Sequence, residues 1–224
     1  MTTDIKIGKS NDLCLISGPC AIESEDLVMN VAEKICKITE KLPVSYVFKS
    51  SFDKANRSSI NSPRGIGLSE GLKILEKVRK TFDIPVLTDV HEDTPLDEVA
   101  DVVDVIQTPA FLCRQTNFIT KVASTMKPIN IKKGQFMSPH DMQYAVEKVT
   151  SEGNSKVILT ERGTSFGYHN LVVDMRTFPI LRTLGHPVIF DVTHSLQQPG
   201  AGNGVTSGQA EFIETLASAG VAAG

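Results

Sequence analysis

The pattern that decides the fold is clearest in the stretch Tyr46-Val47-Phe48-Lys49-Ser50-Ser51-Phe52-Asp53-Lys54-Ala55-Asn56-Arg57-Ser58-Ser59. Its apolar start, residues 46–48, predicts a short buried strand, and polar residues crowd the loop that follows. Lysine offers a mobile positive charge, arginine a planar fork of donors and serine a hydroxyl group. The loop is therefore either a solvated surface loop or a cradle for an anion. The other strand ends of the chain decide between these readings.

The same arrangement recurs along the chain, because short apolar runs alternate with longer amphipathic ones. Strands are predicted over residues 13–16, 46–49, 84–88, 105–107, 128–131, 156–160 and 187–191, and helices over 24–38, 68–78, 96–102, 117–126, 142–149, 176–184 and 212–222. These elements form seven βα units without a repeat or a break in composition. Nearly continuous apolar strands indicate burial on both faces, which is typical of a parallel sheet.

An alternating β/α string suits either a doubly wound sheet or a (β/α)8 TIM barrel. We favour the barrel, because seven consecutive units approach the eightfold count and no dinucleotide-binding turn is found. The glycine-rich residues 65–71 do not spell GxGxxG and do not directly follow a strand. We expect one barrel domain over residues 1–224, with a hairpin over about 1–12 and seven units over about 13–224.

The eighth βα unit is not visible in the sequence, which stops at residues 221–224 where the seventh helix would end. We therefore expect the barrel to be truncated at its C-terminus. Either the chain is a fragment, or the barrel is completed in another way. A missing final strand would leave two open sheet edges.

Composition narrows the class of protein. The chain has 224 residues, of which 41% are hydrophobic and 22% charged, as in ordinary soluble proteins. Its net charge of −3 argues against a general nucleic-acid binder, so any anion site must be local. No apolar run approaches the roughly 18 residues of a membrane span, and the N-terminus lacks a signal-peptide core. The four cysteines form no CxxC pair, and together these features predict a cytoplasmic protein.

Polar, charged or thiol groups follow all seven predicted strands, at the end where barrel enzymes carry their catalytic residues. The cations among them are Lys49, Lys54, Arg57, Lys132, Lys133 and Arg162, with Arg114 nearby. Converging on one mouth, they would neutralise several anionic groups, such as two phosphates and a carboxylate. These ends favour the anion cradle over the solvated loop.

A thiol and an imidazole follow the first and the seventh strand. Cys20 and His194 would flank the place of the eighth strand, and this pair of ligand types suits a divalent metal such as zinc or iron. The alternative is a buried structural cysteine and a histidine that only donates hydrogen bonds.

Longer runs carry a resemblance to a known family. They are 18–24, 48–59, 88–92, 107–115, 130–136, 161–174 and 190–197. In these runs the sequence resembles the 3-deoxy-D-manno-octulosonate 8-phosphate (KDO-8-phosphate) synthases. The resemblance implies a (β/α)8 barrel, a homotetramer, and condensation of phosphoenolpyruvate with arabinose 5-phosphate and water, releasing phosphate, in lipopolysaccharide biosynthesis.

The resemblance also implies roles for individual residues. Lys132 and Arg162 would hold the phosphate of phosphoenolpyruvate, and Lys54, with Lys49 and Ser51, would orient its carboxylate and the aldehyde. The sugar phosphate would be bound by Asn56, Arg57 and Ser58, and the pocket lined by Asp89, Gln107 and Gln135. Lys54, Asp89, Cys20 and His194 are the expected catalytic residues.

Cys20 implies the metal-dependent type of the family, since metal-independent members carry Asn here. Cys20 and His194 would bind zinc, iron or manganese, and no organic cofactor is expected. The family's remaining ligands, a Glu and an Asp, lie in the last βα unit, beyond residue 224. Residues 198–204 are glycine-rich and are expected to form a mobile loop over the site.

Two other readings remain. The first is a related enzyme of the heptulosonate type, which condenses phosphoenolpyruvate with another aldose phosphate. The second is an inactive truncated barrel that only binds phosphosugars.

Overall fold

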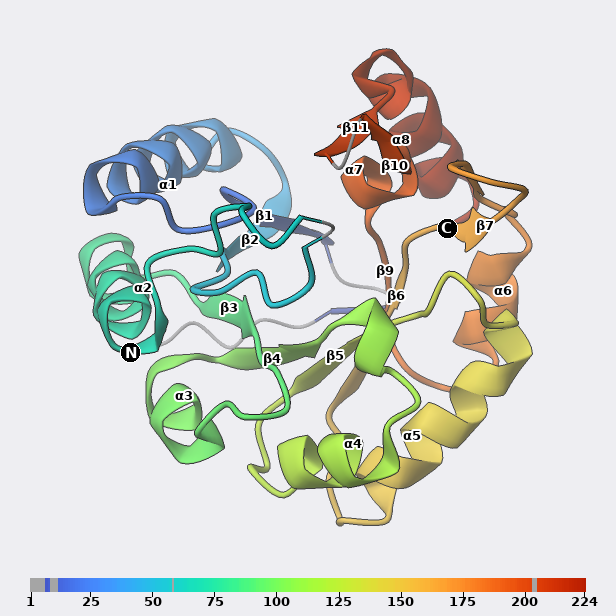
Figure 1. The fold of residues 1–224 in the computed structure, drawn as a ribbon, viewed down its shortest axis with the longest axis horizontal. Helices are drawn as coiled ribbons and strands as arrows, with labels where there is room; N and C mark the ends of the chain where they lie inside the picture. Colours follow the sequence, from blue (N-terminus) through green and yellow to red (C-terminus); the bar gives the residue numbers. More distant parts are fainter. Residues whose placement is uncertain (1–6, 9–11, 58, 203–204) are drawn as a thin grey trace. The chain divides into compact units, whose positions relative to one another are not determined.

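The computed structural model of the chain describes residues 7–8, 12–57, 59–202 and 205–224 (Figure 1). These residues form two compact units. The first unit comprises the described residues of 7–57 and 61–107, and the second those of 59–60 and 108–224. Most of the hairpin predicted over residues 1–12 lies outside the described residues. The expectation of a single domain stays a prediction.

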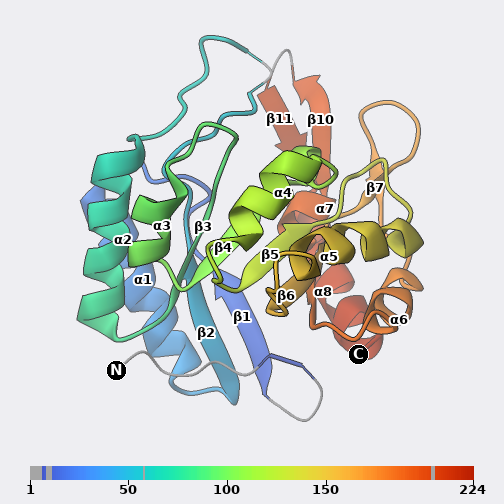
Figure 2. The ribbon, with the colours of Figure 1, turned by 90° about the horizontal axis from the view of Figure 1, so that it is seen from below.

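The first unit alternates strands and helices along a parallel sheet (Figure 2). Its elements are β1 (Leu13–Ser17), α1 (Glu25–Thr39), β2 (Val44–Lys49), α2 (Leu68–Phe82), β3 (Val86–Asp89), α3 (Leu96–Val102) and β4 (Val105–Thr108). In register, Ser17 lies opposite Phe48, Lys49 opposite Leu87, and Asp89 opposite Gln107. This register brings the C-terminal ends of β2, β3 and β4 to one edge of the sheet.

Helix α1 begins where the sequence predicts it. The side chain of Ser24 accepts a hydrogen bond from the Leu27 amide at 3.3 Å, and Glu25 and Asp26 occupy the positive end of the helix dipole. Val28 and Ala32 are fully buried, so one stripe of the helix faces the core.

The ends of β1 and β2 approach so closely that only glycine fits between them. A Cβ atom on Gly18 would lie 2.1 Å from the carbonyl oxygen of Lys49. A further parallel bridge joins Ala21 to Ser51. The residues directly after β1 are thereby held against the start of the polar loop after β2.

The second unit has the same plan around β5, β6 and β9, which are parallel. Its elements are α4 (Thr116–Ala123), β5 (Ile129–Lys132), α5 (Met142–Thr150), β6 (Val157–Glu161), β7 (Thr164–Ser165), β8 (Leu171–Val172), α6 (Thr177–Arg182), β9 (Val188–Phe190), α7 (Val192–Ser195), β10 (Gln197–Gly202), β11 (Val205–Gly208) and α8 (Ile213–Ala222), with 3-10 turns at Ala110–Leu112, Pro139–Asp141 and Ala210–Phe212. Lys132 lies opposite Thr160, and Glu161 opposite Phe190. The ends of these three strands therefore meet at one edge.

Several short elements were not predicted. The turn after β6 folds into the antiparallel pair β7–β8, and α7 follows β9. The glycine-rich stretch 198–204 was expected to be a loop, but its described part belongs to the antiparallel pair β10–β11 (Figure 2). Backbone pairing between the two strands of this hairpin begins at Gln197 and Gly208. Amino-acid composition does not reveal such pairing.

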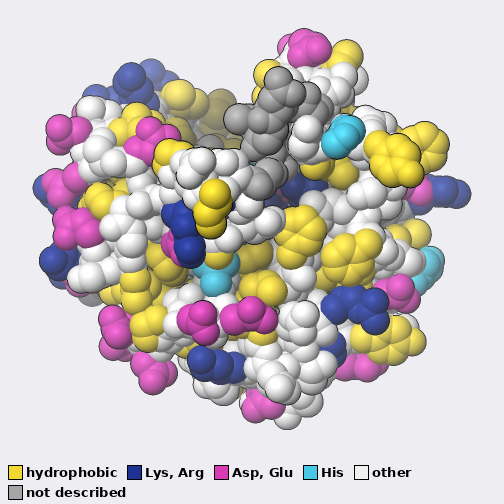
Figure 3. Space-filling view, in the orientation of Figure 1, with side chains coloured by type: hydrophobic (Ala, Val, Ile, Leu, Met, Phe, Trp, Pro, Cys, Tyr) yellow, Lys and Arg dark blue, Asp and Glu magenta, His cyan; other side chains and the backbone are white. Residues whose placement is uncertain are grey.

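The seven predicted strands and seven predicted helices are confirmed, with ends shifted by a few residues. The α/β class and the parallel strands are also confirmed. The closed barrel and the missing eighth unit stay predictions. Among the described residues, no helix combines the length and apolar character needed to cross a bilayer. On the face drawn in Figure 3, acidic and basic side chains are interspersed, as expected for a nearly balanced chain.

Candidate active site

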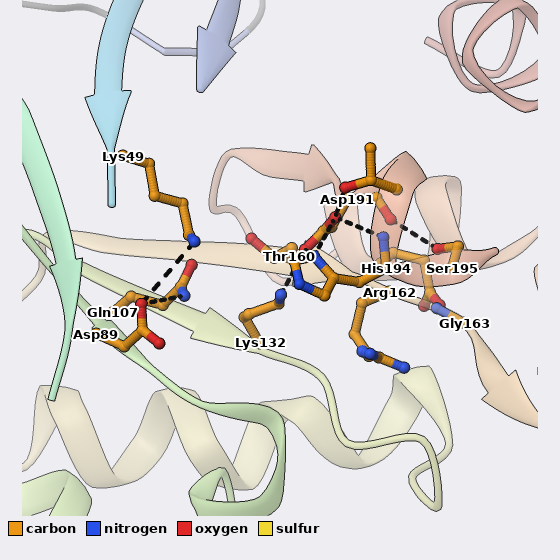
Figure 4. A network of polar contacts seen from close by, with 12 residues as sticks. Lys49, Asp89, Gln107, Lys132, Thr160, Arg162, Gly163, Asp191, His194 and Ser195 are labelled. Atoms are coloured by element: carbon orange, nitrogen blue, oxygen red, sulfur yellow. Dashed lines mark hydrogen bonds and ion pairs between the residues drawn. The ribbon is translucent and has the colours of Figure 1, made fainter. Parts of the chain in front are cut away.

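The first cluster of polar side chains surrounds the carboxylate of Asp89 at the end of β3 (Figure 4). Its Oδ1 accepts hydrogen bonds from Ser51 Oγ at 2.6 Å and from Gln107 Nε2 at 3.4 Å. Lys49 Nζ lies 3.9 Å from Oδ1, and Lys54 Nζ lies 3.6 Å from Oδ2. Two ammonium groups therefore share one buried carboxylate, and the cluster keeps a net positive charge.

Ser51 connects two members of this cluster. Its hydroxyl donates to Asp89 and accepts from Lys54 Nζ at 2.7 Å. Because Ser51 is fully buried, the direction of its hydrogen bonds holds the Lys54 ammonium beside the carboxylate. The structure thus brings together five residues that the sequence predicted: Lys49, Ser51, Lys54, Asp89 and Gln107.

The loop after β2 is closed at its base. Arg64 binds Asp53 in bidentate fashion, with Nε at 2.9 Å from Oδ1 and Nη2 at 2.5 Å from Oδ2, and the Lys54 amide donates to the Arg64 carbonyl at 2.6 Å. The hydrogen bonds from Arg64 hold the pKa of Asp53 below its usual value. Farther along the loop, Asn56 and Arg57 are exposed.

The predicted sugar-phosphate residues are thus only partly placed. Arg57 Nε donates to the Pro63 carbonyl at 3.1 Å, and Ser58 lies outside the described residues. His91, which follows β3, packs edge-on against Phe52 with ring centroids 6.4 Å apart, and burial lowers its pKa.

The second cluster surrounds Asp191, directly after β9 (Figure 4). Lys132 Nζ donates to Oδ2, and His194 Nδ1 lies 2.9 Å from Oδ1. Burial alone would raise the pKa of Asp191, but the positive charge of Lys132 and the hydrogen bonds from Lys132 and His194 outweigh it and hold the pKa well below its usual range. Asp191 is therefore a carboxylate that orients both neighbours.

Arg162, at the end of β6, carries unused donors. Its Nη2 donates to Gln197 Oε1 at 2.9 Å, but its Nε and Nη1 are buried and lack a hydrogen-bond partner among the described residues. The residue is only 5% exposed, and burial lowers the pKa of its guanidinium group. Buried donors of this kind are costly unless a ligand satisfies them, and a phosphate or carboxylate matches the geometry of the fork.

Gln135, another predicted pocket residue, is 9% exposed, and its Oε1 also has no hydrogen-bond partner within the described part of the chain.

One predicted convergence is wrong. Lys132 and Lys133 were both expected at the mouth, but successive residues of a strand point to opposite faces. Lys132 reaches Asp191, whereas Lys133 is fully buried and lies 3.4 Å from Glu161 Oε2.

Cys20 and His194 were predicted as metal ligands. Because the Asp191 carboxylate accepts from His194 Nδ1, the neutral ring has its lone pair on Nε2, as in histidines that bind metals. Cys20 is exposed in the first unit. A thiol and an imidazole therefore fit zinc or iron by donor type. No group of three or more candidate ligands is found among the described residues, and joint binding by Cys20 and His194 stays a prediction.

Two contributors were missed by the sequence reasoning. Asp191 and Gln197 were not among the predicted site residues, although Asp191 directly follows an apolar strand, as Asp89 does. That shared position was the available signal for Asp191. No local sequence signal points to Gln197, because its contact with Arg162 spans 35 positions.

The sequence as a whole matches a known protein family. The family described as "DAHP synthetase I family" matches residues 1–224. The chain belongs to this family. Curated relatives named 2-dehydro-3-deoxyphosphooctonate aldolase are similar along nearly the whole chain.

Three of these relatives illustrate the degree of sequence identity. That of Francisella tularensis subsp. mediasiatica is 55% identical over 221 residues, that of Dichelobacter nodosus 57% over 222, and that of Coxiella burnetii 58% over 221. Each match covers 99% of this chain and 80%, 80% and 79% of the respective relative. Within the DAHP synthetase I family, the chain is thus similar to proteins named for 2-dehydro-3-deoxyphosphooctonate.

Proposed function

We propose that this chain is a KDO-8-phosphate synthase, which condenses phosphoenolpyruvate with arabinose 5-phosphate and water. The name carried by its relatives, 2-dehydro-3-deoxyphosphooctonate aldolase, denotes the same enzyme as 3-deoxy-8-phosphooctulonate synthase. The observation that carries the proposal is the buried guanidinium of Arg162, whose Nε and Nη1 have no hydrogen-bond partner in the described part of the chain. Such donors suit an anionic substrate group.

The second cluster suits the phosphate of phosphoenolpyruvate. Arg162 offers a planar fork of donors, and Lys132 adds an ammonium group that Asp191 holds in place. A positive, largely buried pair of this kind stabilises the charge that accumulates on the departing phosphate. The buried Oε1 of Gln135 is an acceptor, so it would suit the water that adds at C2 or a sugar hydroxyl rather than the phosphate itself.

The first cluster suits the carboxylate and the reacting aldehyde. Lys54 is held by both Ser51 and Asp89, so its ammonium is fixed before substrate binds. In this proposal C3 of phosphoenolpyruvate attacks the aldehyde carbon, and water adds at C2. The C2–O bond to phosphate then breaks and inorganic phosphate leaves. Lys49 and Lys54 orient the anionic groups, and Asn56 and Arg57 bind the phosphate of the sugar.

A divalent metal is part of the proposal, with Cys20 and His194 as ligands. When bound, such a metal polarises a carbonyl oxygen as a Lewis acid. Asp191 orients the His194 ring through Nδ1. Elemental analysis tests this point without reference to activity. We expect bound metal in the wild type and a reduced amount in Cys20→Ser, and an unchanged amount would contradict it.

The closed (β/α)8 barrel, a cytoplasmic location and a homotetramer complete the proposal. Light scattering on the purified protein tests the tetramer directly, since a monomer has a quarter of the expected mass.

The experiment for the activity measures phosphate release from the purified protein with zinc, iron or manganese. Release is expected only when phosphoenolpyruvate and arabinose 5-phosphate are both present, with the octulosonate phosphate identified by mass. Faster turnover of erythrose 4-phosphate would instead support the heptulosonate type. Phosphosugar binding without phosphate release under any condition would overturn the enzymatic proposal.

A further inference from the structure

A fully buried ion pair forms where β5 and β6 end, between the residues next to Lys132 and Arg162. Lys133 is 0% exposed and Glu161 1% exposed, and Lys133 Nζ lies 3.4 Å from Glu161 Oε2. The two side chains also form hydrogen bonds to Thr164 and to the Gly163 amide, in the segment after β6.

The pair joins two loops rather than two points on one element. Lys133 Nζ donates to Thr164 Oγ1 at 3.1 Å, in the segment after β6, and approaches the carbonyls of Gly134 and Met137 at 3.3 and 3.4 Å, in the segment after β5. Glu161 Oε1 in turn accepts from the Gly163 amide at 2.6 Å. One ammonium group thus fixes the course of both segments.

These two segments carry the ligand-binding side chains. Lys132 directly precedes Lys133, and Arg162 directly follows Glu161. Each pair of neighbours is joined by one peptide bond, so a shift of Lys133 or Glu161 moves Lys132 or Arg162 with it. Gln135 lies within the same segment, and its carbonyl accepts from the Ser165 amide at 2.9 Å.

Stability alone is a poor reason for such a pair. Two charges lose their hydration when they are buried, and apolar replacements of a buried pair are often neutral or stabilising. Glu161 Oε2 also lacks a hydrogen-bond partner among the described residues, so only charge attraction satisfies it. The pair is therefore better explained by the backbone positions that it enforces.

We propose that Lys133 and Glu161 are positioning residues, which hold Lys132 and Arg162 in register for the phosphate of phosphoenolpyruvate. This inference rests on the proposed function. It predicts that breaking the pair weakens phosphoenolpyruvate binding much more than it affects arabinose 5-phosphate.

The test compares Glu161→Gln with the double variant Lys133→Met/Glu161→Gln. Glutamine keeps the oxygen that accepts from Gly163 but leaves the Lys133 ammonium buried without a counter-charge. The double variant contains no unpaired charge, so it remains informative if the single variant fails to fold. Val149→Ala, a fully buried apolar truncation on α5, serves as a control for lost stability.

The measurements are the melting temperature, the Kd for phosphoenolpyruvate by calorimetry, and the KM for each substrate. We expect Glu161→Gln to lower the melting temperature and to weaken phosphoenolpyruvate binding at least about tenfold, because small displacements of binding groups are costly. The KM for arabinose 5-phosphate should change less than about twofold. The double variant should regain stability without regaining affinity.

Two outcomes would overturn the inference. One is that the double variant recovers stability and phosphoenolpyruvate affinity together. The other is that Val149→Ala weakens phosphoenolpyruvate binding as much as Glu161→Gln at an equal loss of melting temperature. A wild-type protein that binds phosphoenolpyruvate but releases no phosphate would refute the proposed function alone, because the binding comparison still tests the positioning role.

Discussion

Replacing Arg162 with Met removes a buried guanidinium whose donors are only partly satisfied. Its Nη2 binds Gln197, but Nε and Nη1 have no hydrogen-bond partner among the described residues. If these donors await a phosphate, the substitution should affect stability and ligand binding in opposite directions. An arginine that served only the core would affect both in the same direction.

The expected magnitude follows from those contacts. A buried polar group without a partner costs about 1–3 kcal/mol, so the two nitrogens together cost about 2–6 kcal/mol, whereas the hydrogen bond to Gln197 contributes about 1.5–3 kcal/mol. The central difference favours the unliganded variant by about 2 kcal/mol. In a chain of this size each kcal/mol shifts the melting temperature by about 2–4 °C, so a rise of about 4–8 °C is expected.

Ligand binding should change far more. Two lost hydrogen bonds to a charged group amount to about 3–6 kcal/mol, which weakens phosphoenolpyruvate binding by about 10²- to 10⁴-fold. Calorimetric titration and thermal unfolding measure both quantities on the same sample. Arg176→Met is the matched control, because Arg176 is exposed and pairs with Asp174 in the same unit.

The reasoning is refuted if Arg162→Met binds phosphoenolpyruvate within about tenfold of the wild type, which is less than one such hydrogen bond is worth. It is also refuted if the variant loses stability as an ordinary core truncation does, since the donors would then be satisfied in the unliganded protein.

Three further predictions concern the first unit. Asp89→Asn removes the carboxylate shared by Lys49 and Lys54. Steady-state kinetics should show a loss in kcat/KM of at least about a hundredfold, as for reacting groups displaced by about 1 Å. A near-normal kcat/KM would show that Asp89 does not orient these lysines for the reaction. Gly18→Ala places a Cβ 2.1 Å from the Lys49 carbonyl, and denaturant titration should reveal a loss of about 1–3 kcal/mol, with an unchanged midpoint as the contrary result. The pKa of Asp53 is lowered by Arg64, so this pair stabilises the fold above the unfolded pKa of about 3.9 and loses its effect as the pH falls through the lower folded pKa. Between about pH 5 and 3, the melting temperature of Asp53→Asn should therefore depend less on pH than that of the wild type. The same pH dependence in both proteins would contradict this.

Much of the fold could be predicted because its signals are local. The apolar run 157–160 and the spacing of Val28 and Ala32 depend on a few neighbouring residues, and β6 and α1 appear where these patterns indicate. The hairpin β10–β11 could not be predicted in this way. Its pairing joins Gln197 to Gly208 through the backbone, and glycine-rich composition is equally typical of a loop.

In the candidate site, too, the local features could be predicted from sequence and the long-range contacts could not. Lys49, Lys54 and Asp89 in the first unit, and Lys132 and Arg162 in the second, could be found from sequence, because each stands at or shortly after the end of a buried strand. The sequence could not tell that Lys132 and Lys133 have separate tasks. Either lysine alone is compatible with a solvated charge or with a ligand.

The sequence by itself determined the alternation of strands and helices, the strand ends that carry chemistry, and the family to which the chain belongs, because each depends on residue types at short spacing. The tertiary structure decided which of these groups act on each other. Asp89 joins three elements, Asp191 holds Lys132 and His194, and Lys133 turns away to Glu161. The physical reason is that a charge has its chemistry set by partners within about 4 Å, and chain segments tens of residues apart supply those partners.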